Sequence, residues 1–438
     1  MKTNRGQRHT RREFMRSVAM GVGATVGFGN LVWVREAHGG KAAANERITL
    51  GLIGMGTRVQ NQLLRGFLEH PDTQVVSVCD VWDHRVADSV RQAEEFYGQA
   101  KRSGDFHGVA GVKDFREIVS RADIDAVVIG TPDHWHAVQA LMAIRAGKDV
   151  YCEKPLTRTV EEARVLVAAV REHETIFQTG SQQRSDESFR FAAELVRSGR
   201  IGTLQDVSVQ VGGPPDRCLL PGQAIPASLD WEMWLGPAAW RPYHEELCPQ
   251  KDGTFPNWRG YEEFGGGGVA DMGAHHFDIA QWAMDMDRSG PIEVVPPEDG
   301  SHSGLYLRYA SGVCVHHLPD CIPGTGLRFD GTEGSITAVR WKCETDPVEI
   351  GGRPIGPEEV TLYKSDDHMG NWLECIRSRK DPVAPVEAGA HTAVVCHLVN
   401  IGYKLGRALK WDPSEWAFVG DAEANGLLKR TLRSPWTL

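Results

Sequence analysis

The stretch RITLGLIGMGTRVQNQLLRGFLEH, residues 47–70, constrains the fold more than any other part of the chain. It begins with a continuous apolar strand and turns through glycines into a helix with one apolar side. A second strand, QVVSVCD (74–80), follows, and this strand–helix–strand order predicts a parallel sheet. Gly54 and Gly56 lie where a glycine turn lets backbone N–H groups approach a pyrophosphate. Val59 stands where the dinucleotide-binding pattern has a third glycine, so the match is imperfect.

Asp80 ends the second predicted strand, where a carboxylate can accept hydrogen bonds from the ribose hydroxyls of NAD. The same charge repels the 2′-phosphate of NADP, so NAD is the predicted cofactor and NADP the less favoured one. Arg85 is close in sequence and keeps NADP open. A helix N-cap is the competing structural interpretation of Asp80.

The alternation of strands and helices continues to residue 184. Helices are predicted at 111–121, 136–147 and 159–174, and strands at 125–132, 149–155 and 175–184. Such alternation is typical of a doubly wound parallel sheet, whose ligands bind at the carboxyl ends of the strands. Those ends carry residues that we expect on one rim: Thr131, Pro132, Asp133, His136, Glu153, Lys154, Gln183 and Arg184.

The pattern changes after about residue 185. Runs with turn glycines predict a mostly antiparallel sheet with strands at 203–212, 304–318, 328–341 and 358–364. Helices are predicted at 189–202, 368–379 and 387–408. We therefore predict an α/β chain in three parts: a signal and linker (1–45), a Rossmann domain with a doubly wound parallel sheet (46–184), and an α+β domain with a large open sheet (185–438).

Four motifs, in this order and spacing, make the chain resemble the Gfo/Idh/MocA oxidoreductases: GLIGMG (51–56), CD (79–80), GTPDHWHA (130–137) and CEKPLT (152–157). The resemblance runs from about residue 47 to the C-terminus. It implies an active site between the two domains, a catalytic Lys154 and a homo-oligomer, either a dimer or a tetramer. The predicted cofactor contacts are Gly54, Met55, Gly56, Thr57, Asp80, Arg85, Thr131, Pro132, His136, Glu153 and Lys154.

The segment GGGGVADMGAHHFD (265–278) places titratable groups directly after four glycines. A helix here puts Asp271, His275 and Asp278 on one face, at i, i+4 and i+7. The glycines allow a sharp turn close to a ligand or to the opposing sheet. His276 points elsewhere on the helix and is expected to cap or pack.

Three interpretations of this helix face compete: a catalytic site, a metal site and a solvated surface. In the catalytic one, His275 is a general base with Asp271 beside it, and Lys154 holds a developing alkoxide. The resemblance favours catalysis, because the family has an Asp, a His four residues later and an Asp three residues beyond. No metal is therefore expected. The predicted substrate contacts are Lys154, Gln183, Arg184, Asp271, His275 and Asp278.

Some residues near the predicted site also have a purely structural interpretation. Gln183 and Arg184 follow the last parallel strand, and a hydrogen bond at the domain interface explains them equally well. The stretch 230–264 holds Trp231, Trp234, Trp240 and Trp258. These aromatic residues could stack on a sugar, pack in a core or contact a neighbouring subunit.

Charge and cysteine content narrow the function. The formal net charge is −10 without a basic stripe, so nucleic acid is not an expected partner. The nine cysteines are scattered without a CxxC pair, which indicates buried free thiols rather than a zinc site or a disulfide framework.

The N-terminus resembles a twin-arginine export signal. HTRREFMRS (9–17) precedes an apolar run at 18–34 that is short and contains four glycines, so a stable membrane span is not expected. We therefore expect export of the folded protein to the periplasm by the twin-arginine machinery, with its cofactor already loaded.

The function expected from these features is NAD-dependent hydride transfer at a secondary hydroxyl of a sugar or polyol, inositol- or glucoside-like, with tightly bound, recycled NAD. The first alternative is an NAD-assisted glycosidase that oxidises, eliminates, hydrates and reduces. The second is a non-enzymatic sugar-binding protein with structural NAD, against which the intact Lys154, Asp271 and His275 argue.

Overall fold

The computed structural model describes residues 47–98, 108–251, 253–321 and 325–438. The predicted signal and linker, residues 1–45, lie outside the described residues. Within the described ranges, no helix is both long and apolar enough to cross a membrane.

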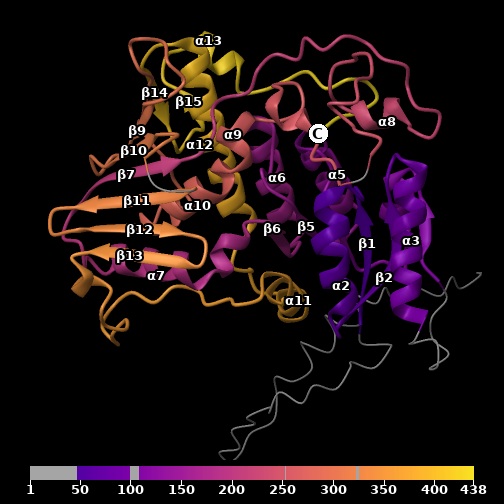
Figure 1. Cartoon of the computed structure of the whole chain (residues 1–438), viewed down its shortest axis with the longest axis horizontal. Coiled ribbons are helices and arrows are strands. Elements are labelled where there is room, and N and C mark those ends of the chain that lie inside the picture. Colours follow the sequence, from indigo (N-terminus) through magenta and orange to yellow (C-terminus); the bar gives the residue numbers. More distant parts are fainter. Residues whose placement is uncertain (1–46, 99–107, 252, 322–324) are drawn as a thin grey trace, which may run out of the picture. The chain divides into compact units, whose positions relative to one another are not determined.

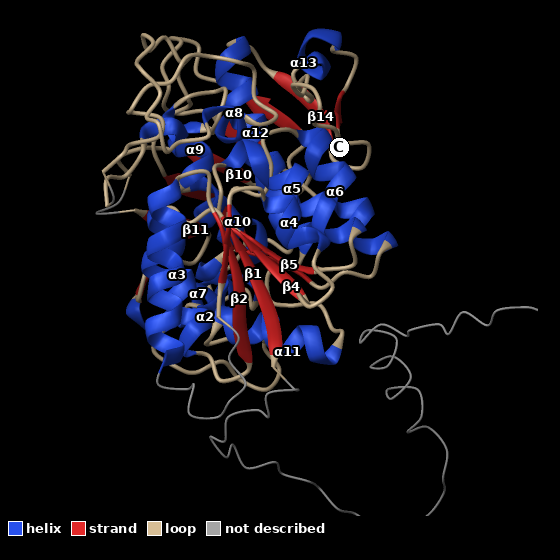
Figure 2. Ribbon diagram, turned by 90° about the vertical axis from the view of Figure 1, so that its right-hand side faces the viewer, coloured by secondary structure: helices blue, strands red, loops and turns tan. Residues whose placement is uncertain are grey.

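The first sheet is parallel and has six strands in the order β3-β2-β1-β4-β5-β6. The strands are β1 (Ile48–Ile53), β2 (Thr73–Cys79), β3 (Ala110–Val112), β4 (Ala126–Ile129), β5 (Asp149–Cys152) and β6 (Phe177–Thr179). The helices are α2 (Arg65–Glu69), α3 (Asp83–Gly98), α4 (Phe115–Ser120), α5 (Asp133–Arg145) and α6 (Val160–Glu172). Figure 2 shows α2 and α3 on one side of the strands and α4, α5 and α6 on the other. This architecture confirms the predicted doubly wound sheet.

One predicted helix of this domain is wrong in its first part. Residues 111 and 112 of the predicted 111–121 helix belong to the edge strand β3, and the helix α4 begins only at Phe115. Asp114 separates the two, because its side chain accepts a hydrogen bond from the backbone N–H of Arg116 and caps the helix.

The imperfect glycine pattern has a structural explanation. Val59 begins a π-helical turn, Val59–Leu64, that leads into α2. A Cβ added at Gly130, directly after β4, would lie 2.2 Å from Cγ2 of Val59. The glycine that allows close helix–strand packing therefore stands on the strand side of this contact, and the valine stands on the helix side.

We expect Gly130→Ala to destabilise the protein by about 1–3 kcal/mol, because the new methyl group would overlap the side chain of Val59. Denaturant unfolding measures this loss. In a double-mutant cycle, Val59→Ala should cancel most of it. Gly98→Ala is the matched control, since no other heavy atom lies within 4 Å of its Cβ position. Equal losses for the two alanine variants would contradict the contact.

The second sheet is mixed but mostly antiparallel, with nine strands in the order β13-β12-β11-β7-β10-β9-β8-β14-β15 (Figure 1). The strands are β7 (Leu204–Gln210), β8 (Glu293–Val295), β9 (Tyr306–Arg308), β10 (Cys314–His317), β11 (Gly326–Gly331), β12 (Ser335–Val339), β13 (Lys342–Asp346), β14 (Leu409–Asp412) and β15 (Ala417–Phe418). The helices of this part are α7 (Glu187–Arg197), α8 (Trp231–Leu235), α9 (Gly267–Asp271), α10 (Gly273–Ala283), α11 (His368–Ser378), α12 (Val386–Leu405) and α13 (Ala422–Gly426). The predicted large open sheet is confirmed.

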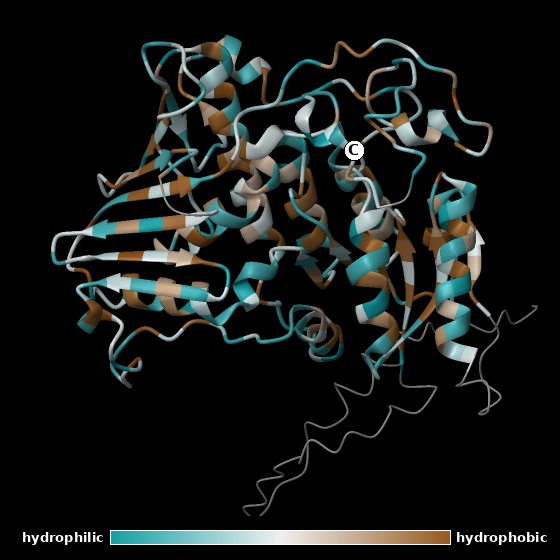
Figure 3. Ribbon diagram, in the orientation of Figure 1, coloured by the Kyte–Doolittle hydropathy of each residue, from teal (hydrophilic) through white to brown (hydrophobic). Residues whose placement is uncertain are grey.

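Helices cover one face of this sheet. α7 packs against β12, α10 against β7, and α12 against both α10 and α6 of the first domain. On the covered face, Val207, Leu327 and Phe329 are buried, while their sequence neighbours Arg328 and Asp330 are half-buried on the other face. The hydrophilic colours along β11 and β13 in Figure 3 agree with this polar outer face.

The strand predicted at 358–364 does not form. This segment runs as irregular chain along α7, and two of its backbone N–H groups bond to side chains there: Val360 to Ser198 Oγ and Leu362 to Glu194 Oε1. The edge of the sheet is β13 instead, paired with β12. Side-chain acceptors have replaced the strand partners that the sequence pattern suggested.

Candidate active site

The glycine turn after β1 opens onto a cavity. Gly54 has φ +88°, and a Cβ there would lie 2.7 Å from the backbone nitrogen of Thr131, so only glycine fits. A Cβ at Gly56 would meet no heavy atom within 4 Å, which leaves this part of the backbone accessible to a ligand.

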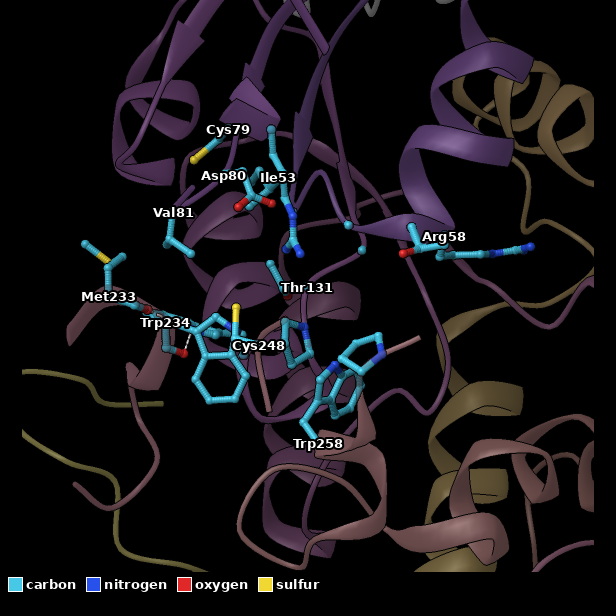
Figure 4. Close-up of a pocket in the computed structure, with 18 of the residues that line it drawn as sticks. Ile53, Arg58, Cys79, Asp80, Val81, Thr131, Met233, Trp234, Cys248 and Trp258 are labelled. Carbon is cyan, nitrogen blue, oxygen red and sulfur yellow. Dashed lines mark hydrogen bonds between the residues drawn. The ribbon is translucent and has the colours of Figure 1, made fainter. Parts of the chain in front are cut away.

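The cavity has a volume of about 860 Å³, including space open to solvent, and lies at the carboxyl ends of β1, β2 and β4. Figure 4 shows Asp80 and Ile53 on one side of it and Trp234, Cys248 and Trp258 on the other. Seven of the predicted cofactor residues line it: Gly54, Gly56, Thr57, Asp80, Arg85, Thr131 and Pro132.

Asp80 is buried at the end of β2 and accepts a hydrogen bond of 2.9 Å from the backbone N–H of Trp82. Burial raises the pKa of its carboxyl group above the ordinary value, although Arg85 acts in the opposite direction. Arg85 itself donates to the carbonyl oxygen of Pro249 at 3.1 Å. An acidic acceptor at this strand end together with the open glycine turn fits NAD, whose ribose hydroxyls and pyrophosphate these two features would bind.

A roof over the cavity was not predicted. Residues 228–251 and 253–259, which include part of the tryptophan-rich stretch, fold back onto the loop after β2 and form one wall of the cavity, which we call the roof. The Trp82 Nε1–H group donates to Cys248 Sγ at 2.9 Å, and the Asp230 N–H group donates to the Val81 carbonyl oxygen at 3.0 Å. Trp231 and Trp234 stack with ring centroids 4.6 Å apart and anchor the roof as buried residues.

Lys154 and Asp271 meet although they are 117 residues apart. Lys154 Nζ lies 2.7 Å from Asp271 Oδ1 and donates to the Asp271 carbonyl oxygen at the same distance. Burial favours a raised pKa for Asp271, but the charges of Lys154 and Arg259 outweigh it and hold the pKa below the ordinary value. Asp271 is therefore ionised at neutral pH and fixes the Lys154 ammonium group.

His275 is 4% exposed, and its buried Nδ1 has no hydrogen-bond partner among the described residues. Burial, with the positive charges of Lys154 and Arg340, holds the pKa of His275 well below its ordinary value. The ring is therefore neutral at neutral pH, which is the protonation state that a general base needs before the reaction. His276 points the other way, and its Nδ1 bonds to the Gly326 carbonyl oxygen at 3.0 Å, so it packs against the sheet.

The four glycines before these residues permit a close backbone crossing. A Cβ at Gly268 would lie 2.5 Å from Cα of Gly212, so the start of α9 crosses the chain that leaves β7. The predicted single helix is interrupted at Met272 into α9 and α10. The Met272 backbone stays in the helical region, which keeps Asp271 and His275 about one turn apart.

Arg184 and Asp278 bind each other rather than facing a ligand. Both are almost fully buried, and Arg184 makes two hydrogen bonds of 2.8 Å to Asp278 and two more to Asp287. Thr392 also donates to Asp278. These contacts occupy the polar groups of the pair, so the predicted substrate contacts of both residues are replaced by a structural ion pair between the two parts of the chain.

The other predicted residues lie behind the cavity wall. His136 bridges two loops, since its Nδ1 lies 2.8 Å from the Pro155 carbonyl oxygen and its Nε2 lies 2.9 Å from that of Thr131. Glu153 accepts from Arg58 Nε at 3.1 Å and from Gln182. Both are buried and position the loops that carry the predicted site.

Gln183 and Met55 are also enclosed by protein. With its side-chain amide oriented to satisfy its neighbours, Gln183 donates to the His275 carbonyl oxygen at 3.2 Å and accepts from Arg340 Nε at 3.3 Å. It therefore supports α10. The Met55 side chain is fully buried, so this residue offers only its backbone to the turn.

Sequence reasoning missed one charged residue of the site, Arg259, and assigned no role to another, Asp133, which it placed on the rim. The guanidinium group of Arg259 lies 4.2 Å from the ring centroids of both Phe255 and Trp258, lines the cavity, and brings Nε to 3.6 Å from Asp271 Oδ1. Asp133 is buried at the start of α5, and burial raises its pKa to about 7 against the pull of Arg259 and Arg158. The motif GTPD could have indicated Asp133, whereas nothing in the sequence distinguishes Arg259.

Two family models match the chain. Residues 48–181 match the oxidoreductase family with an NAD-binding Rossmann fold, and residues 216–309 and 358–438 match the C-terminal alpha/beta domain of the same family. Together the matched segments cover more than half of the chain, the whole first sheet, and β8, β9, β14 and β15 of the second sheet.

Individual relatives agree with these matches. A 1,5-anhydro-D-fructose reductase from Ensifer adhaerens is 27% identical over 301 residues, which cover 65% of this chain and 74% of the reductase. A glycosyl hydrolase family 109 protein from Saccharopolyspora erythraea is 34% identical over 175 residues, but these span only 37% of each chain.

A solved structure shows the same fold. The WlbA dehydrogenase from Bordetella pertussis, in complex with NADH and UDP-GlcNAcA, superposes with a TM-score of 0.57 at 18% identity and covers 84% of this chain and 99% of the dehydrogenase. With the glycine turn, the acidic strand end and the family matches on the same residues, the chain belongs to the Gfo/Idh/MocA family of NAD-binding oxidoreductases.

Proposed function

We propose that the protein oxidises or reduces a secondary hydroxyl of a sugar or polyol, with Lys154, Asp271 and His275 as its catalytic groups. The observation that carries this proposal is the Lys154–Asp271 ion pair of 2.7 Å beside a buried, neutral His275. NAD supplies the hydride acceptor when bound. The sugar class is supported by the name of the reductase relative, which aligns over 74% of its own length.

Each group has a distinct task in the proposed reaction. His275 Nδ1 lacks a partner, and a substrate hydroxyl would supply one and pass its proton to this nitrogen. The Lys154 ammonium group stabilises the negative charge that develops on the substrate oxygen. Asp271 holds Lys154 in place, and Arg259 supports Asp271 from the other side.

An NAD-assisted glycosidase is the second candidate, favoured by the 34% identity to a glycosyl hydrolase family 109 protein. To test both, purified full-length chain is incubated with sugars, polyols and chromogenic glycosides while nicotinamide absorbance and aglycone release are followed. Net NADH formation supports the dehydrogenase, and aglycone release without net NADH supports the glycosidase. Sugar binding without either signal contradicts both and indicates a binding protein.

We also propose that NAD is tightly held and recycled in place, because the roof is bonded to the loop that carries Asp80. We expect Trp82→Phe to speed the release of NAD by up to about tenfold, since it removes the 2.9 Å hydrogen bond to Cys248 and part of a fully buried ring. Stopped-flow dilution with a competing nucleotide measures the release rate. Trp240→Phe, at an exposed position of the same segment, should leave the rate unchanged. Equal rates for wild type and Trp82→Phe would contradict the retention role of the roof.

Export and assembly are proposals as well. The paired arginines at 11–12 and the apolar run at 18–34 support export to the periplasm by the twin-arginine machinery. A homo-oligomer, a dimer or a tetramer, is supported by the exposed aromatic residues Trp240 and Phe255 on the roof. Cell fractionation of the full chain, and light scattering of the purified protein, test these two proposals.

A further inference from the structure

Three potential metal ligands meet on the outer face of the nine-stranded sheet, on the neighbouring strands β7 and β10. Asp206 of β7 stands directly opposite Cys314 of β10, and His316 follows Cys314 by two residues on the same face. One ligand atom from each of the three residues lies within 4.8 Å of the other two. His316 Nε2 is 2.9 Å from Asp206 Oδ1.

The period of the strand explains why only one of two adjacent histidines joins this group. His317 points to the covered face, where its Nδ1 lies 2.6 Å from the Tyr403 hydroxyl and its Nε2 faces the carbonyl oxygens of Val211 and Gly212. His316 points outward with 29% of its side chain exposed, and Asp206 is 50% exposed. An ion in solution can therefore reach the cluster.

The nearby cations already have acidic partners. Arg308 approaches Cys314 Sγ to 3.7 Å, but its Nε pairs with Glu293 at 3.0 Å. Arg328 pairs with Asp330 at 2.8 Å on the next strand. Asp206 contacts His316, an imidazole that needs no charge to hydrogen-bond, so its carboxylate charge remains available to a cation.

We propose that Asp206, Cys314 and His316 form a zinc-binding site. A thiolate, an imidazole nitrogen and a carboxylate are the ligand types that Zn²⁺ prefers, whereas Mg²⁺ and Ca²⁺ select oxygen ligands. Binding releases the thiol proton of Cys314 to solvent, and water takes the fourth coordination position. This departs from the expectation of no metal, which was drawn from the scattered cysteines and from the helix face of Asp271 and His275.

The zinc site is separate from the proposed catalytic groups. Asp271 and His275 lie on α9 and α10, and α10 packs against the covered face of the sheet, whereas the zinc site is on the other face. β7 and β10 form the parallel pairing among the described strands of this sheet, and the ion would link them. We therefore expect zinc to stabilise the domain without taking part in turnover.

The test uses full-length, tag-free protein stripped of metal and titrated with Co²⁺ as a spectroscopic probe for Zn²⁺. We expect one equivalent to bind with a thiolate-to-cobalt charge-transfer absorption, and Zn²⁺ to displace it and raise the melting temperature. Cys314→Ser should abolish the absorption, and His316→Ala should weaken binding by at least about 10-fold. Cys343→Ser, a second half-buried thiol of the sheet, is the matched control and should bind as wild type.

Asp206→Asn provides a second variant that keeps a hydrogen-bonding partner for His316 while removing the charge, and it should also weaken binding. Circular dichroism and NAD content confirm that each variant is folded. Absence of the charge-transfer absorption, its survival in Cys314→Ser, or its equal loss in folded Cys343→Ser would overturn the proposal.

Discussion

Replacing Lys154 by methionine is expected to lower turnover by about 10²–10³-fold, because the variant keeps the length of the side chain but loses the charge that stabilises a developing alkoxide. The Nζ atom is held by two contacts of 2.7 Å to Asp271, so the charge is fixed before substrate arrives. His275→Ala should cost about 10²–10⁴-fold, since it removes the proposed base, and should leave NAD bound.

Steady-state kinetics measures both losses, with the sugar, polyol or glycoside that the incubation described above identifies as the substrate. Lys410→Met, at an exposed position on β14, is the matched control and should turn over as wild type. The two catalytic losses should not add in the double variant, because the groups act on one proton transfer. Turnover near the wild-type rate in folded, NAD-loaded His275→Ala would place the base elsewhere.

Stability should fall steeply as the pH drops below about 6.5. Burial lowers the pKa of several histidines, four of them strongly: His134 and His397 to about 3, and His276 and His368 to about 4. Between these values and about 6.5, the unfolded chain binds protons that the folded protein refuses, so the stabilisation present above pH 6.5 is lost as the pH falls. Four such groups give about 5 kcal/mol per pH unit near pH 5, a large part of an ordinary domain's total stability.

Denaturant unfolding at pH 5, 6 and 7 measures this slope. His276→Asn keeps a donor for the Gly326 carbonyl oxygen but cannot titrate, so the slope should fall by about 1.4 kcal/mol per pH unit. A free energy of unfolding that is constant from pH 7 to pH 5 would show that the folded protein accommodates protonated histidines.

Sequence patterns predicted the structural elements that are determined by residues close together in the chain. The apolar runs and the glycine turn at Gly54 predicted the parallel sheet, and the strand ends placed Thr131 and Lys154 on one rim. The helical spacing of Asp271 and His275 also placed them together, although the helix is interrupted at Met272. Each of these inferences depends on residues close in sequence or on a general property of parallel sheets.

The features that the sequence did not predict depend on contacts between residues far apart in the chain. Arg184 and Asp278 are 94 residues apart, and their burial as a pair depends on how α10 packs, which no local pattern reveals. The roof depends on single contacts such as Trp82 with Cys248, 166 residues away. Residues 358–364 have a strand-like composition, but they run beside a helix that supplies side-chain acceptors instead of a strand. Arg259 is part of the site because the folding of the roof brings it close to Asp271.

Nucleotide content tests the central claim most directly: the roofed cavity beside Lys154, Asp271 and His275 holds NAD for redox chemistry. Full-length protein is purified without added nucleotide and denatured, and the supernatant is examined by mass spectrometry, with a binding titration on the native protein. The account predicts NAD in nearly one equivalent per chain. Absence of nucleotide together with no NAD binding on titration would contradict it, and NADP in place of NAD would contradict the role of Asp80.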